Sequence, residues 1–152
     1  MDCASAEFWM REALIEAGKA ESEGEVPVGA VLLINDKIVG RGHNRSIFAH
    51  DPTAHAEILA LRQAAHSMRN HRIMGSILVV TIEPCAMCVG AMIHARVDEL
   101  VYGAADPKAG AVDSHFNLAG AQQLNHRIAV TSGILADQCR ALVQAFFESR
   151  RK

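Results

Sequence analysis

The sequence carries little excess charge of either sign. Its 15 Lys and Arg residues nearly balance 17 Asp and Glu residues, so the formal net charge is −2 at pH 7. This balance supplies no molecule-wide positive field, and any nucleic-acid partner would have to bind a local basic patch. Arg69, Arg72 and the terminal Arg150-Arg151-Lys152 are candidates for such a patch, although a solvated helix end explains each of them equally well.

Long apolar segments are also missing. No run approaches the roughly 20 apolar residues of a membrane-spanning helix, and Asp2, Glu7 and Arg11 interrupt the apolar stretch that a secretory leader would need. Two of the four cysteines form a Cys-x-x-Cys pair. In such a chain this pair more often binds a metal or has a redox function than forms a structural disulfide. We therefore expect a cytoplasmic protein with no membrane association.

Repeats, low-complexity segments and linker-like boundaries are absent as well. Half of the residues are hydrophobic and 21% are charged, which is ordinary for a globular protein. A chain of 152 residues can bury most of its surface around one core. We expect one domain that spans residues 1–152.

Helical and extended patterns alternate along the chain. The predicted elements are a helix over 4–22, a hairpin of 28–34 and 37–42 around the turn 35–36, a helix from 51 to about 65, a strand over 77–81, a short helix over 85–95, strands over 99–103 and 127–131, and a final helix from 135. This order predicts an α/β fold with a mixed five-stranded sheet between helices. The long link after residue 103 has room for a crossover, so we expect the last two strands to be parallel.

Ionisable residues lie at two of the predicted helix starts. Asp51 and Pro52 are typical of an N-cap and a first helical residue, which would place His55 and Glu57 in the first turn. Cys85 follows the carboxyl end of a predicted central strand, where open α/β sheets bind ligands. Both positions favour a functional site over a core role.

Cys85 and Cys88 would direct their sulfurs to a common point, because they are three residues apart on one helical turn. His55 would complete a set of three zinc ligands and leave a fourth position for water. Glu57 would then be the carboxylate that moves the proton of that water. Two thiolates neutralise the charge of zinc, but positive potential at two helix N-termini would favour thiolate and an activated water.

Other interpretations of the cysteine pair remain open. A redox pair is one, although the preceding Glu83-Pro84 does not suggest that chemistry. A structural zinc site is another, and it would need a fourth protein ligand. The candidates for this ligand are His43, His50 and His94. Cys139 lies on the apolar stripe of the last predicted helix and is expected to pack as a small hydrophobic residue.

Beyond the His-x-Glu and Pro-Cys-x-x-Cys motifs of zinc nucleobase deaminases, several stretches match one family. They are residues 25–31 (EVPVGAV), 42–45 (GHNR), 51–58 (DPTAHAEI), 83–94 (EPCAMCVGAMIH), 102–104 (YGA), 125–127 (NHR) and 133–136 (GILA). On these residues the chain resembles the bacterial tRNA-specific adenosine deaminases, which are members of the cytidine deaminase-like superfamily. The likeness extends from about Trp9 to Phe147.

The resemblance implies a three-layer α-β-α fold, a zinc ion held by His55, Cys85 and Cys88, and Glu57 as the proton shuttle. It also implies a homodimer that converts the wobble adenosine of a tRNA anticodon stem-loop to inosine. Expected substrate contacts are Asn44, which holds the nucleoside, Asp106, which contacts the nucleotide backbone, and Val28 and Ala56, which line the base pocket. The helix over 87–93 is a candidate for the subunit contact, and burial against the sheet would explain its apolar character equally well.

Three features depart from the family pattern: Ala105 replaces a frequent basic residue, His71 replaces a frequent tyrosine, and the basic tail stops at Lys152. These features affect how tRNA would be held and leave the zinc chemistry untouched. A free-base or nucleoside deaminase acting on cytosine, cytidine or guanine is the alternative enzyme, since the same zinc core serves those reactions. A non-catalytic, zinc-stabilised RNA-binding module is a further alternative, which Glu57 disfavours.

Overall fold

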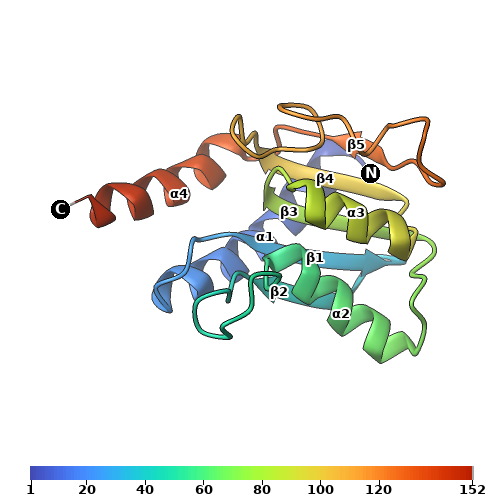
Figure 1. Cartoon of the computed structure of the whole chain (residues 1–152), viewed down its shortest axis with the longest axis horizontal. Coiled ribbons are helices and arrows are strands. Elements are labelled where there is room, and N and C mark those ends of the chain that lie inside the picture. The colour runs from blue at the N-terminus through green and yellow to red at the C-terminus, as the bar shows by residue number, and fades with distance from the viewer. Residues whose placement is uncertain (152) are drawn as a thin grey trace.

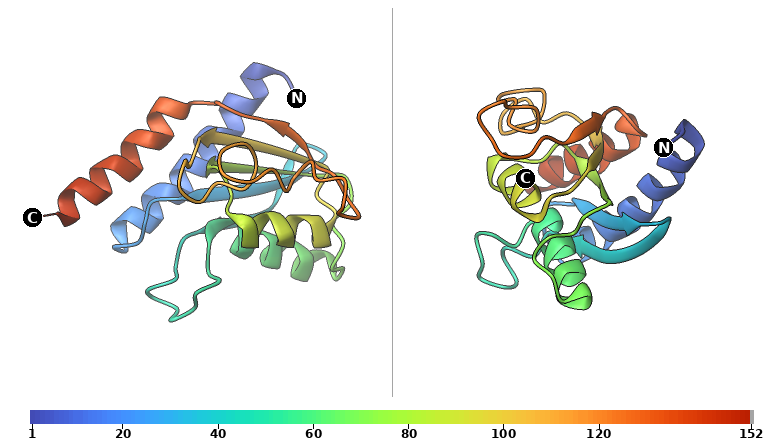
Figure 2. Two further views of the ribbon diagram at one scale, coloured as in Figure 1. Left: turned by 45° about the horizontal axis from the view of Figure 1, so that its top comes forward. Right: turned by 90° about the vertical axis from the view of Figure 1, so that its right-hand side faces the viewer.

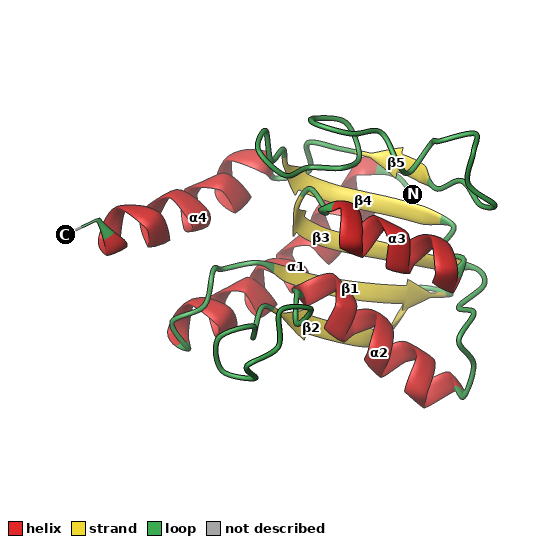
Figure 3. Ribbon diagram, viewed as in Figure 1, coloured by secondary structure: helices red, strands yellow, loops and turns green. Residues whose placement is uncertain are grey.

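A five-stranded mixed sheet forms the centre of the molecule (Figure 1, Figure 3). The computed structural model describes residues 1–151. Within them the elements are α1 (Cys3–Ser22), β1 (Gly29–Ile34), β2 (Lys37–His43), α2 (Ala56–Met68), β3 (Ser76–Ile82), α3 (Ala86–Ala95), β4 (Glu99–Ala104), β5 (Ala129–Thr131) and α4 (Ala136–Arg150).

The strand order is β2-β1-β3-β4-β5. Strand β1 pairs antiparallel with both β2 and β3, whereas β3, β4 and β5 run parallel. Asn35 and Asp36 join β1 to β2 with φ values of 50° and 59°, as a tight hairpin turn requires. The predicted hairpin and the parallel pairing of the last two strands are both confirmed.

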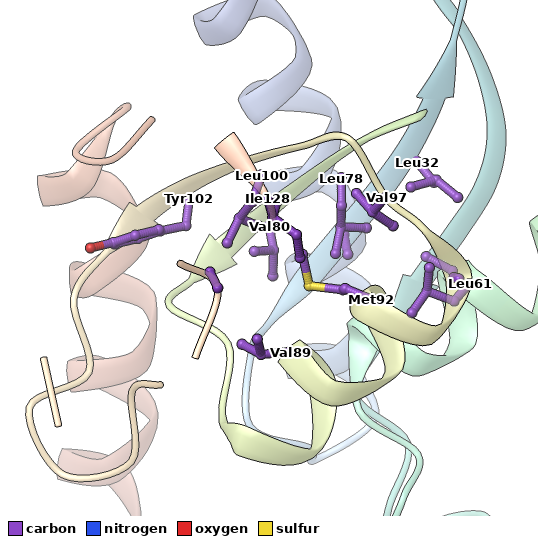
Figure 4. Packing of buried hydrophobic residues seen from close by; sticks show 14 of the residues in the cluster. Leu32, Leu61, Leu78, Val80, Val89, Met92, Val97, Leu100, Tyr102 and Ile128 are labelled. Carbon is purple, nitrogen blue, oxygen red and sulfur yellow. The ribbon is translucent and has the colours of Figure 1, made fainter. Parts of the chain in front are cut away.

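Helices cover both faces of the sheet, which gives three layers. The two views in Figure 2 show α2 and α3 on one face and α1 and α4 on the other. Side chains alternate accordingly: Leu78 and Val80 of β3 point toward α2 and α3, while Val79 between them points toward α1. Figure 4 shows the larger of the two cores, where the side chain of Met92 extends from α3 toward the strands. Cys139 is fully buried in the smaller core, as predicted.

Two glycines of β2 bring α2 unusually close to the sheet. A Cβ atom at Gly40 would overlap the backbone carbonyl of Ala60, and one at Gly42 would overlap that of Ala56. Because Ala56 is the first residue of α2, the absence of a side chain at Gly42 allows this helix to begin in close contact with the sheet.

The start of α2 differs from the prediction. The helix begins at Ala56, and Asp51 does not cap it. Asp51 instead accepts hydrogen bonds from the backbone N–H and the hydroxyl of Thr53, at 2.8 and 2.7 Å. This local turn satisfies the capping group of Asp51 before any helix forms. As a result, His55 lies at the N-cap, one residue before the first turn that contains Glu57.

The remaining boundaries shift by a few residues. Strand β5 begins at Ala129 instead of residue 127, and the link over 105–128 consists of turns without a helix. Its turn near Leu118 is closed by one hydrogen bond, from the Ala121 N–H to the Leu118 carbonyl. No helix within residues 1–151 is both long and apolar enough to cross a membrane. Lys152, part of the proposed basic tail, lies outside the described residues.

Candidate metal centre and cleft

Two helix starts present the predicted metal ligands. His55 is the N-cap of α2 and Cys85 is the N-cap of α3, and neither side chain caps its own helix. Both residues have extended backbone, with φ of −78° and −79°. Cys88 lies one turn further along α3 and is fully buried. The helices therefore direct two sulfurs and one imidazole toward a common point, as the spacing predicts.

The distances between these three side chains match a zinc tetrahedron. Nδ1 of His55 lies 3.6 Å from Sγ of Cys85 and 3.5 Å from Sγ of Cys88, and the two sulfurs are 3.8 Å apart. A tetrahedral ion with bonds of ~2.3 Å to sulfur and ~2.05 Å to nitrogen separates its ligand atoms by about 3.8 Å (S–S) and about 3.6 Å (S–N). The three ligand atoms thus occupy three corners of such a tetrahedron without any rearrangement.

The protonation of these groups is coupled. A hydrogen bond between the two sulfurs lowers the pKa of Cys85 to about 4 and raises the pKa of Cys88. A hydrogen bond with Cys85 likewise raises the pKa of His55. Cys85 is therefore a thiolate at neutral pH, which is the form that binds metal.

Glu57 lies beside this cluster and is only 4% exposed. Its burial raises the pKa of the carboxyl group to about 7, while the charge of His55 opposes this shift. A carboxyl group whose pKa lies near neutrality can both accept and release a proton at physiological pH.

Asn44 fixes the start of the helix that carries His55 and Glu57. Its Oδ1 accepts a hydrogen bond of 2.8 Å from the N–H of Ala56. This bond caps α2 from a distant part of the chain, because the side chain of His55 does not cap it. Asn44 also lines the cleft over the metal centre.

A cleft of about 860 Å³ opens over the metal centre. This volume lies within the usual range for a small-molecule site. The cleft is lined by His55, Glu57 and Cys85 at its base, by Val26, Val28 and Asn44, by Ile82, Glu83 and the segment 104–109, and by Arg140, Val143, Gln144, Phe147, Arg150 and Arg151 of α4 and its end. Lys108 and the three arginines make its rim basic although the chain as a whole is slightly acidic.

The terminal arginines therefore belong to the cleft, whereas Arg69 lines a separate depression with Arg62, His66 and His71. Arg150 is held in place by a hydrogen bond of 2.7 Å to the carbonyl of Gly24. Its guanidinium group also lies over the ring of Phe146. Of the basic patches considered from the sequence, the terminal one is next to the metal centre.

The other predicted site residues lie in or under this cleft. Val28, Asn44 and Asp106 line it, and so does Ala105. Ala56 is fully buried beneath the lining, where its N–H bonds to Asn44.

A fourth protein ligand is not present among residues 1–151. In this part of the chain, His55, Cys85 and Cys88 are the one group of three or more potential ligands within reach of a single ion. His43 instead hydrogen-bonds to Glu23 at 2.9 Å, and His50 and His94 are exposed elsewhere. This geometry disfavours a closed structural zinc site and keeps one coordination position open.

Two buried glutamates next to the cleft were not predicted from the sequence. Glu25 is 2% exposed and accepts hydrogen bonds from the N–H groups of Ile47 and Phe48. Glu83 is 3% exposed and accepts bonds from the loop around Asp106. Burial by itself raises the pKa of Glu83, but the hydrogen bonds from Ser114, Asp113 and Asp106 outweigh burial and hold this pKa below its usual value.

A family profile described as the cytidine and deoxycytidylate deaminase zinc-binding region matches residues 4–104. The chain belongs to this family. His55, Cys85 and Cys88 form its zinc site.

Curated relatives extend the match to nearly the whole chain. The tRNA-specific adenosine deaminase of Haemophilus influenzae is 50% identical over 96% of this chain and 85% of its own length. The enzyme of the same name from Bacillus subtilis is 44% identical over 96% of this chain and 91% of its own length. The resemblance to the tRNA-specific adenosine deaminases is thus confirmed.

Solved structures show the same fold. A structure from work on A-to-I editing by tRNA:A34 deaminases at the wobble position of transfer RNA has a TM-score of 0.86 and 39% identity, and the match covers 89% of this chain and 98% of that one. A guanine deaminase from Nitrosomonas europaea has a TM-score of 0.78 and 29% identity, over 92% of this chain and 83% of that one. The cytidine deaminase-like fold is therefore confirmed.

Proposed function

We propose that this chain acts as a single zinc-dependent hydrolase domain that converts the wobble adenosine of a tRNA anticodon to inosine and releases ammonia. The observation that carries this proposal is the open three-ligand zinc site with Glu57 beside it, at the base of a cleft with a basic rim. Among the solved structures, the tRNA:A34 deaminase is 39% identical to this chain and the Nitrosomonas europaea guanine deaminase is 29% identical, which supports the choice of substrate.

His55, Cys85 and Cys88 hold the zinc ion, which when bound supplies a Lewis acid that activates a water molecule. Glu57 accepts the proton of this water as the oxygen attacks C6 of the adenine ring. The same carboxyl group then delivers that proton to the ring nitrogen next to C6. It next takes the remaining proton of the attacking oxygen and passes it to the departing amino group, as the C6–N bond breaks and C6=O forms. Water and adenosine are consumed, and inosine and ammonia are produced. A buried carboxyl group with a pKa of about 7 is suited to both directions of transfer.

The target base has to leave its stack to reach this site. An unpaired base in an anticodon loop does so at little cost, whereas a base inside a duplex does not. We assign Asn44 to hold the nucleoside through its –NH₂ group, Val28 and Ala56 to shape the base pocket, and Asp106 to contact the nucleotide backbone near the target. The rim arginines would neutralise phosphates on either side of the flipped base.

A substrate assay tests this proposal. The zinc-loaded protein is incubated with an anticodon stem-loop that carries adenosine at the wobble position, and inosine is measured by mass spectrometry of the digested RNA. The matched control has the same adenosine in a fully paired duplex. We expect inosine in the stem-loop alone, and absence of inosine from the stem-loop would contradict the assignment.

The second candidate is a deaminase for a free base. It is favoured by the fold likeness to the guanine deaminase and by the slightly acidic chain. The same preparation is therefore assayed for ammonia release from guanine, cytosine and cytidine. Activity on one of these together with no activity on the stem-loop would replace the tRNA substrate by the free base.

We also propose a homodimer that forms through the exposed side of α2 and α3. A groove of about 480 Å³ between these helices is lined mainly by apolar side chains, among them Ile58, Leu61, Met87 and Ala91, and also by Thr53, Arg62, His71 and His94. Met87 is 37% exposed although it lies on a strongly apolar helix. Light scattering after size-exclusion chromatography should give twice the chain mass, and a Met87→Glu variant should reduce it to the mass of one chain.

A further inference from the structure

We propose that Glu83 is a positioning residue that fixes the wall segment 104–114, of which residues 104–109 line the cleft, relative to the zinc site. This inference rests on the proposed function, because it assigns this wall, and Asp106 in it, to substrate binding. Glu83 itself acts through the wall and makes no contact with the reacting atoms.

The carboxylate of Glu83 makes most of the side-chain hydrogen bonds that attach the wall segment. Oε1 accepts hydrogen bonds from the Asp106 N–H at 3.1 Å and from the Ser114 hydroxyl. Oε2 accepts three further bonds, from the N–H groups of Val112, Asp113 and Ser114, at 3.1, 2.7 and 2.9 Å. One side chain thus satisfies four backbone donors and one hydroxyl that lie 23 to 31 residues further along the chain.

A carboxylate is the group that this arrangement requires. Every backbone group pointing at Glu83 is an N–H donor, so both oxygens must accept, and a glutamine would place its –NH₂ group against at least one of these N–H groups. Gly110 makes the close approach possible, because a Cβ atom at this position would overlap the carboxylate of Glu83 and the carbonyl of Asp106. The wall therefore matches the glutamate in both charge and shape.

The attachment also sets the distance between the wall and the metal. Glu83 is followed by Pro84 and then by the zinc ligand Cys85. The Glu83 N–H donates to the Ala104 carbonyl at 2.9 Å, and the Ala111 N–H donates to the Pro84 carbonyl at 2.8 Å. Residues 83–85 thus connect the wall segment, bound by Glu83 and Pro84, to the zinc ligand Cys85. The wall segment can move relative to the zinc site only if these hydrogen bonds break.

Asp106 depends on this attachment for its position in the cleft. Its N–H bonds to Glu83, and its Oδ1 accepts bonds from the N–H groups of Lys108 and Ala109, which close a local turn. Without Glu83 the turn itself would persist, but it would no longer be fixed over the zinc site. A misplacement of about 1 Å at such a site costs up to about 100-fold in rate.

The first test does not depend on activity. Hydrogen exchange of the zinc-loaded protein is measured by mass spectrometry in wild type, Glu83→Gln and Ser114→Ala. We expect faster exchange in the peptides over 104–114 of Glu83→Gln, a smaller increase in Ser114→Ala, and unchanged zinc content. Ser114 is exposed and its replacement removes one bond to Glu83, so this variant should fold normally. Unchanged exchange in both variants would overturn the proposal.

The second test asks whether Glu83 acts through Asp106. Initial rates on the anticodon stem-loop give KM and kcat for Glu83→Gln, Asp106→Ala and the double variant, well below their thermal transitions. We expect Glu83→Gln to raise KM more than it lowers kcat. We also expect Glu83→Gln to lower kcat/KM by no more than about threefold in the Asp106→Ala background, because coupled residues are not additive.

Glu25→Gln is the matched control, since Glu25 is equally buried and holds backbone N–H groups on the opposite side of the cleft. In the double variant, the fold-decrease in kcat/KM caused by Glu25→Gln should multiply with the fold-decrease caused by Asp106→Ala. If the fold-decreases in kcat/KM caused by Glu83→Gln and Asp106→Ala also multiply in their double variant, Glu83 has only a structural role and the proposal fails. If wild type does not deaminate the stem-loop, the proposed function fails while the exchange experiment still decides whether Glu83 holds the wall.

Discussion

The base of the cleft and its rim are built in different ways. The base consists of His55, Glu57, Cys85 and Cys88, which lie at the N-caps and in the first turns of two helices that pack against the central sheet. The rim consists of a loop fixed by Glu83 and of the helix α4, in which only Cys139 is buried. The base is therefore rigid and carries chemistry that many substrates can share. The rim decides which molecule reaches this chemistry, so changes to the base should affect turnover and changes to the rim should affect binding.

The largest effect is expected for Cys88→Ser, which removes a thiolate from the base. Loss of a hydrogen-bonding partner behind a metal ligand already weakens metal binding by about 10- to 100-fold, and loss of the ligand itself should weaken it by at least about 100-fold. Elemental analysis after dialysis should find little zinc and no turnover. Cys3→Ser changes an exposed cysteine and should retain both. Full zinc content in Cys88→Ser would contradict the assigned ligand set.

Glu57→Gln should separate metal binding from proton transfer. Loss of a general acid–base group typically costs about 100- to 10,000-fold in rate. We expect a decrease of this size in single-turnover inosine formation, with one zinc per chain retained. Glu21→Gln, an exposed position on α1, serves as the control and should leave the rate unchanged. Substantial turnover by Glu57→Gln would remove Glu57 as the proton shuttle.

Asn44 lies where base and rim meet, and two substitutions separate its roles. Asn44→Ala removes the acceptor that caps α2, which should lower the free energy of unfolding by about 1 kcal/mol. Asn44→Asp keeps this acceptor but lacks the –NH₂ group. We expect denaturant unfolding to show restored stability in Asn44→Asp, while its kcat/KM on the stem-loop stays as low as that of Asn44→Ala. Recovery of kcat/KM together with stability would limit Asn44 to a capping role.

The smallest effect is expected at the outer rim. Arg151→Ala removes one positive charge from the cleft and should raise KM for the stem-loop a few-fold with unchanged kcat. The slope of log KM against log salt concentration should decrease by about one, as for one lost phosphate contact. Arg72→Ala alters the other basic patch proposed from the sequence and should change neither value. The reverse result would place the RNA on the α2 side of the molecule.

The base of the cleft was largely predictable because its signals are local. Cys85 and Cys88 are one helical turn apart, and Glu57 follows His55 by two residues. The exact start of α2 was not predictable, because Asp51 is a good capping residue that forms a turn with Thr53 instead. The cap that does form comes from Asn44, twelve residues before the helix, and such a contact exists only after β2 is in place.

The way in which the rim is held was not predictable from sequence patterns, although Asp106 and the terminal arginines were candidates for contacts with substrate or nucleic acid. Glu83 looks like any charged residue after a strand, and nothing near it in the chain indicates that its partners lie at residues 106 to 114. Periodicity predicted α4 and the burial of Cys139 correctly. It did not show that Phe147 and Arg150, further along this helix, border the cleft.

The direction of the three-residue strand β5 affects the size of the substrate that the cleft can hold. Because β5 runs parallel to β4, it ends at the same edge of the sheet where β3 delivers Cys85, and α4 starts there. An antiparallel β5 would send the last helix off from the opposite edge and leave the pocket without its outermost lining. The direction of β5 therefore affects how large a molecule the cleft can enclose, while the zinc ligands and Glu57 lie on other elements.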